Sequence, residues 1–82
     1  MDKKRLLQQR ALLGALLRDL RRKQGVRQSV LAEQLGVTQS LVSNYESGQR
    51  RIDVLELREL CAVLGVPLEE VLRQLEQRLA GA

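Results

Sequence analysis

The sequence predicts an all-α protein of five helices, and three observations favour this class. Its 82 residues include eighteen leucines and many Arg, Gln and Glu, which lose little side-chain freedom in a helix. Aromatic residues make up only 1% of the chain, so side chains that favour strands are scarce. Four glycines each follow an amphipathic segment directly, as they do at helix ends. A chain of this length is expected to form one small domain, residues 1–82.

Glycines mark the ends of the first four expected helices, and apolar residues recur between them at the spacing of one helix face. The expected helices run from about 6 to 24, 28 to 35, 39 to 47, 54 to 64 and 67 to 79. The glycines are Gly25, Gly36, Gly48 and Gly65. The expected core residues are Leu13, Leu17, Leu20, Leu31, Leu35, Val42, Tyr45, Leu57, Leu60, Cys61, Leu64, Leu68, Val71 and Leu72.

The residue types at most of the expected helix starts also support these bounds. Thr38 is placed to cap the third helix, and Asp53 with Glu56 has capping-box spacing for the fourth. Pro67 stands at the start of the fifth, where its missing N–H costs little. The second helix is the exception, because Arg27 occupies its cap position and cannot accept a backbone proton.

One glycine lies inside the first helix. Gly14 either allows another helix to approach closely or is merely tolerated there. The sequence leaves both interpretations open.

The residue types exclude most catalytic chemistry. The chain has no histidine and one cysteine, so the usual zinc ligand sets, an intrachain disulfide and Ser-His or Cys-His pairs cannot form. Its carboxylates recur beside arginines at helical spacing, which is typical of a solvated face. We therefore expect no enzyme, no metal site and no cofactor.

The N-terminus resembles a targeting segment only in part. Three basic residues precede an apolar stretch, but the uninterrupted part covers residues 11–17 alone. A membrane span needs roughly 20 apolar residues, so we expect a cytoplasmic protein with no membrane partner.

Charge is distributed unevenly along the chain. The net charge is +4, with +3 in residues 1–17, +4 in residues 18–52 and −3 in residues 53–82. A basic front and an acidic back are typical of a protein that binds a polyanion on one side.

Residues 28–47, QSVLAEQLGVTQSLVSNYES, predict two short helices joined by a tight turn. Ala32 is small at the point where the second helix would cross the first, and Gly36 provides the left-handed turn. This packing directs one polar stripe of the second helix outward. The stripe comprises Gln39, Ser40, Ser43 and Asn44.

From Leu13 to Leu72 the chain resembles the Cro and lambda-repressor-like (XRE) helix-turn-helix family. The resemblance rests on the stretches LGALLRDLRRKQG, RQSVLAEQLGVTQSLVSNYESGQRRI and LRELCAVLGVPLEEVL, about three quarters of the chain. It implies a five-helix, lambda-repressor-like DNA-binding domain with the helix-turn-helix in the second and third helices. The core would span about 13–72, with the first and fifth helices extended. It also implies a bacterial or phage source.

The resemblance implies roles for individual residues. In the family the third helix enters the major groove. Gln39, Ser40 and Asn44 would then contact bases, with Ser43 as a lesser candidate. The residues that would contact phosphates are Gln28, Arg27, Arg50 and Arg51. Arg21 and Glu46 match positions that often form a structural ion pair, which we expect to be partly buried and to set the angle of the third helix.

The helices at both ends indicate where two copies of the chain would assemble. Leu68, Leu72, Leu75 and Leu79 form a seam with 4-3-4 spacing. The seam either covers the monomer core or joins two subunits, and we favour an interface for Leu75 and Leu79. Leu12 and Leu16 lie about 100° from the core stripe of the first helix, so we place them at the same interface.

The sequence thus predicts a sequence-specific, double-stranded DNA-binding transcriptional regulator. We expect a repressor that binds a palindromic operator as a homodimer and associates with the nucleoid when bound. The alternative is a protein-interaction module, such as an antitoxin or adaptor, with another protein as its main partner. The apolar chain ends favour the alternative, whereas the polar third helix and basic front favour DNA.

Overall fold

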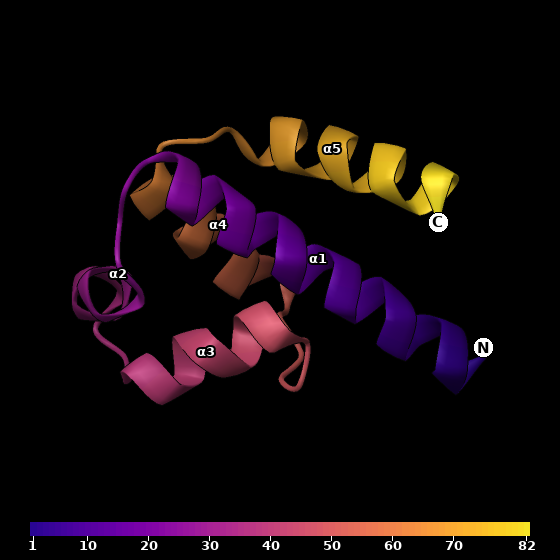
Figure 1. Ribbon diagram of the computed structural model, residues 1–82, viewed down its shortest axis with the longest axis horizontal. Helices are drawn as coiled ribbons and strands as arrows, with labels where there is room; N and C mark the ends of the chain where they lie inside the picture. The colour runs from indigo at the N-terminus through magenta and orange to yellow at the C-terminus, as the bar shows by residue number, and fades with distance from the viewer.

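The computed structural model describes residues 1–82 and contains five helices and no strand (Figure 1). They are α1 (Lys3–Lys23), α2 (Gln28–Leu35), α3 (Gln39–Ser47), α4 (Val54–Leu64) and α5 (Leu68–Gly81). The all-α fold class is confirmed, and α2, α3 and α4 have the expected bounds. Helix α1 packs against α3 on one side and against α5 on the other. None of the helices combines the length and apolar character needed to cross a membrane.

The turn between α2 and α3 depends on Gly36. Its φ of +72° is a left-handed conformation that a side chain would disfavour. The N–H of Val37 then donates to the carbonyl of Ala32 at 3.0 Å, which satisfies one of the carbonyls left over at the end of α2. This turn directs α3 across α2.

The capping residues behave largely as expected. Thr38 accepts a hydrogen bond from the N–H of Leu41, and Asp53 and Glu56 form a complete capping box. Arg27 makes no side-chain cap at α2. The cap of α1 was not anticipated: the carboxylate of Asp2 accepts from the N–H of Lys4 at 2.9 Å, which explains why this helix begins three residues earlier than expected.

All five helices contribute to the core, and most of the expected core residues are in it. Its buried members are Leu16, Leu17, Leu31, Ala32, Val42, Tyr45, Leu57, Leu60, Cys61, Leu64 and Val71.

Two expectations about leucines are wrong. The sequence predicts Leu16 at a dimer interface, but Leu16 is 0% exposed within the single chain. The reason is that α1 lies between α3 and α5, so it buries more than one face. Leu72 was placed in the core but is 43% exposed. Helix α5 faces the core through Val71, which the sequence also predicts to be buried and which lies about 100° around the helix from Leu72.

Candidate nucleic-acid interface

Helix α3 has a buried back and an exposed polar front. Val42, Tyr45 and Glu46 are buried on its inner side. The residues expected to contact bases, Gln39, Ser40, Ser43 and Asn44, are all exposed. The helix therefore presents amide and hydroxyl groups to solvent along one side, as direct contact with base edges requires.

The C-terminal end of α3 lies directly on the backbone of α1. A Cβ atom at Gly48 would be 2.8 Å from the Cα of Ala11, closer than real side chains come. Gly48 also has a φ of +82°. Only glycine satisfies both conditions without strain.

Arg21 and Glu46 join the end of α1 to the end of α3 through a bidentate ion pair. Nε of Arg21 donates to Oε2 of Glu46 at 2.6 Å, and Nη2 donates to Oε1 at 2.9 Å. Nη1 donates to the carbonyl of Val26 at 2.7 Å. The two residues are 7% and 6% exposed, and the hydrogen bond that Arg21 donates to Glu46 raises the pKa of Arg21. A pair so enclosed anchors α3 and is not free to contact DNA.

Gln28, at the start of α2, is tied to the same carboxylate. Its Nε2 donates to Oε1 of Glu46 at 2.9 Å, a contact that the sequence reasoning missed. Only the capacity of one carboxylate to accept several hydrogen bonds could have suggested it. The amide has a second N–H, so this contact leaves one donor for a phosphate. Glu46 thus joins the starts or ends of three helices.

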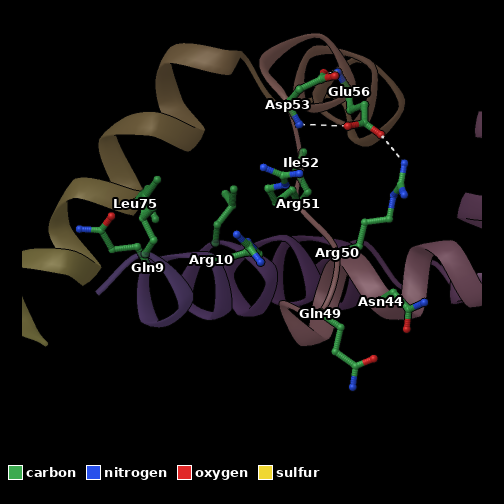
Figure 2. Close-up of a pocket in the computed structure, with 12 residues that line it drawn as sticks. Gln9, Arg10, Asn44, Gln49, Arg50, Arg51, Ile52, Asp53, Glu56 and Leu75 are labelled. Atoms are coloured by element: carbon green, nitrogen blue, oxygen red, sulfur yellow. Dashed lines mark hydrogen bonds and ion pairs between the residues drawn. The ribbon is translucent and has the colours of Figure 1, made fainter. Parts of the chain in front are cut away.

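A second network holds the loop that follows α3. The hydroxyl of Tyr45 donates to Glu56, and Nη2 of Arg50 lies 3.6 Å from Oε2 of the same carboxylate. The guanidinium of Arg50 is also 5.9 Å from the centre of the Tyr45 ring. Figure 2 shows Glu56 between Arg50 and the backbone of Asp53, with which it shares the capping box.

The pKa values of Glu56 and Tyr45 are shifted in opposite directions. The N–H of Asp53, followed by the hydroxyl of Tyr45, lowers the pKa of Glu56. Burial, followed by the hydrogen bond to Glu56, raises the pKa of Tyr45. The phenol therefore remains protonated at neutral pH and donates to an ionised carboxylate.

The expected phosphate contacts come from two places. Arg27 and Gln28 lie at the start of α2, whereas Arg50 and Arg51 lie in the loop after α3. The three arginines are exposed, and neither Arg27 nor Arg51 forms an ion pair. No group of His, Cys, Asp or Glu side chains is arranged to hold a metal ion.

Comparison with known proteins agrees with this geometry. Residues 17–71, more than half of the chain, match the model of a helix-turn-helix family. The chain belongs to the XRE-type helix-turn-helix family. Members of this family bind double-stranded DNA, so the chain is a DNA-binding protein. No curated protein sequence matches it significantly.

Several solved structures resemble this helix-turn-helix protein. The clp gene regulator ClgR from Corynebacterium glutamicum is 31% identical with a TM-score of 0.80, over 85% of this chain and 91% of that one. The restriction-modification controller protein C.AhdI from Aeromonas hydrophila is 31% identical with a TM-score of 0.70, over 74% and 92%. The BldD DNA-binding domain of S. venezulae is 33% identical with a TM-score of 0.70, over 78% and 96%.

Proposed function

We propose that this helix-turn-helix protein is a transcriptional repressor that binds a palindromic operator as a homodimer. The observation that supports this most strongly is the exposed polar front of α3, whose back is held by the buried Arg21–Glu46 pair. A rigid helix with free amides and hydroxyls is suited to the major groove.

Base recognition is assigned to the front of α3. The side-chain amides of Gln39 and Asn44 can each donate to N7 and accept from N6 of an adenine. Gln39 is the first residue of α3 and would enter the groove foremost. Ser40 and Ser43 lie beside them and discriminate less, since a hydroxyl both donates and accepts.

Phosphate contacts are assigned to the two exposed basic sites around α3. Arg27 and Gln28 would bind one stretch of backbone, and Arg50 and Arg51 would bind another. Such contacts position the protein without reporting the sequence. Glu56 partly neutralises Arg50, at 3.6 Å, so Arg51 is the stronger donor of the loop.

The homodimer is assigned to the outer sides of α1 and α5. Leu12, Leu75 and Leu79 are half-buried, Leu75 in part by packing against the core of its own chain, and Leu72 is 43% exposed. Leucines that are only partly covered gain free energy when a second copy removes them from water. Two copies would place their α3 helices in successive major grooves, about 34 Å apart.

The regulatory role is supported by the similar structures. ClgR is a gene regulator and C.AhdI is a controller protein, and each aligns with most of this chain. Repression requires only that the operator be occupied, because a bound protein excludes others from the same duplex.

Selection from random duplexes with the wild-type protein tests the DNA-binding proposal. We expect one enriched site with two-fold symmetry. Gln39→Ala and Asn44→Ala should each weaken binding to that site by about 1–3 kcal/mol. Gln34→Ala removes the same amide from an exposed part of α2 and serves as the control. If no duplex is enriched above nonspecific affinity, the protein-interaction module becomes the better explanation.

Two further measurements test the finer claims. Sedimentation should show a dimer, and a monomer at high micromolar concentration or an enriched site without symmetry would contradict the homodimer. A reporter gene with the selected site across its promoter should be expressed less when the protein is present. Unchanged or higher expression would contradict repression.

A further inference from the structure

A groove of about 980 Å³ lies beside the front of α3. It is lined by the N-terminal half of α1, the loop after α3, the start of α4 and one side chain of α5. Three arginines face it: Arg10 from α1, and Arg50 and Arg51 from the loop. Figure 2 shows Arg50 turned toward Glu56, with Arg10 and Arg51 between it and Leu75.

The positive charges of this groove are only partly balanced. Its two carboxylates, Asp53 and Glu56, are joined in the capping box, and Glu56 also faces Arg50. Arg10 and Arg51 have no carboxylate within ion-pair distance. Two unpaired guanidinium groups in one groove repel each other. An anion bound between them would attract both and so offset that repulsion.

Neutral donors accompany the two arginines. Gln9, Asn44 and Gln49, which carry side-chain amides, are among the residues that line the same groove. Guanidinium and amide N–H groups together are the donors that commonly contact the oxygens of a phosphate. The groove therefore has the chemistry of a phosphate site.

The position of the groove favours a phosphate of DNA. Asn44 lies both in the groove and on the front of α3, so an anion held there is next to the helix that we assign to the major groove. Arg10 lies outside residues 17–71, the part of the chain that matches the family. Its contribution would be a property of the extended α1.

We propose that Arg10 and Arg51 together bind a backbone phosphate of the duplex, so that the N-terminal half of α1 extends the DNA contact. The inference rests on the proposed DNA-binding function. The site adds affinity and salt dependence, but no preference for a base sequence.

The test measures the affinity of the full chain for duplex DNA between about 50 and about 200 mM salt. The variants are Arg10→Gln, Arg51→Gln and the double variant. Arg58→Gln is the matched control, because Arg58 is exposed on α4, outside the groove and without an ion pair. In the double variant, the slope of log affinity against log salt should decrease in magnitude by about 0.9 for each bound copy. Each single variant should bind several-fold more weakly than the control at the lower salt concentration.

Sequence preference separates this inference from the proposed function. If the wild type selects a site that Gln39→Ala no longer distinguishes, but Arg10→Gln binds like Arg58→Gln, the phosphate site is wrong and the proposed function stands. If no site is selected, but Arg10→Gln still binds random duplex several-fold more weakly than Arg58→Gln, the phosphate site stands and the proposed function fails.

Two other occupants of the groove would overturn the inference. One is a free phosphate compound: inorganic phosphate would then raise the melting temperature of the wild type and not that of Arg10→Gln, while both bind DNA alike. The other is a second copy of the chain. Arg10→Gln would then sediment as a smaller species than the wild type, and its weaker DNA binding would be due to the lost dimer. The inference predicts unchanged sedimentation, and it predicts that Arg10→Lys, which keeps the cation, binds DNA more tightly than Arg10→Gln.

Discussion

Gly14 in α1 faces the carbonyl oxygen of Tyr45 in α3, so closely that a Cβ atom there would lie 2.4 Å from that oxygen. The carbonyl oxygen of Glu46 would be 2.6 Å away. The backbones of the two helices therefore meet with no side chain between them. Of the two interpretations that the sequence leaves open for Gly14, the structure supports close approach.

Replacing Gly14 tests how strongly this crossing determines stability. Gly14→Ala should destabilise the protein by about 3 kcal/mol, the upper end for overpacking, because its neighbours are backbone atoms that cannot rotate away. Gly81→Ala is the control, since a Cβ there meets nothing within 4 Å. Urea unfolding measures both. Equal midpoints for the two variants would show that the helices separate at little cost.

Removing Glu46 should leave Arg21 buried without a counter-ion and Gln28 without its acceptor. We expect Glu46→Ala to cost about 3–5 kcal/mol of unfolding free energy. Glu33→Ala, which removes an exposed carboxylate without an ion pair, should change stability by less than about 0.5 kcal/mol. Replacing both partners, as Arg21→Met with Glu46→Leu, should recover much of the loss. The prediction fails if Glu46→Ala unfolds at the wild-type urea concentration.

Glu56 should make stability depend on pH in the acid range. Its pKa in the folded protein is lowered, so its contribution is complete above the unfolded value of about 4.3 and is lost as the pH falls through the folded value. Near neutral pH, Glu56→Gln should be less stable than the wild type by about 1 kcal/mol. The difference should shrink below about pH 4. Unfolding at several pH values measures this, with Glu76→Gln, at an exposed position of α5, as the control. A constant difference down to pH 3 would rule out the assigned cause.

Arg27 should trade helix stability against DNA affinity. Arg27→Ser supplies an oxygen that can accept a hydrogen bond from the N–H of Val30, so α2 gains a cap. The free energy of unfolding should rise by about 1 kcal/mol. The same change removes a cation, so the salt slope of DNA binding should decrease in magnitude by about 0.9 per bound copy.

Arg27→Ala separates the two effects, because it removes the cation without adding a cap. It should bind DNA like the serine variant and should lack its added stability. Thermal unfolding and salt-dependent binding provide both readings. If the serine and alanine variants have the same melting temperature, the missing cap does not limit the stability of α2.

The bounds of α2, α3 and α4 could be predicted because the residues that determine them act within one helical turn. Gly36 permits a left-handed conformation through its own lack of a Cβ, and Thr38 caps a backbone N–H three residues away. The positions of the polar front of α3 followed from helical spacing. These effects are local, because they depend on residues that are close together in the chain, and so they can be predicted from the sequence.

Other features depended on how the helices cross. Spacing assigns one apolar face to each helix, but α1 packs against both α3 and α5, so Leu16 became core against expectation. The same spacing places both Val71 and Leu72 in the core and could not show that Leu72 is turned toward solvent.

The sequence by itself therefore determined the five helices, the bounds of α2, α3 and α4, and the residues that α3 presents to solvent. Only the tertiary structure decided that Gly14 meets the backbone of α3, that Gln28 joins Arg21 on Glu46, and that Arg10 shares a groove with Arg51. The physical reason is that helix ends depend on neighbours in the chain, whereas these contacts join residues from different helices and loops, whose distances are set by packing.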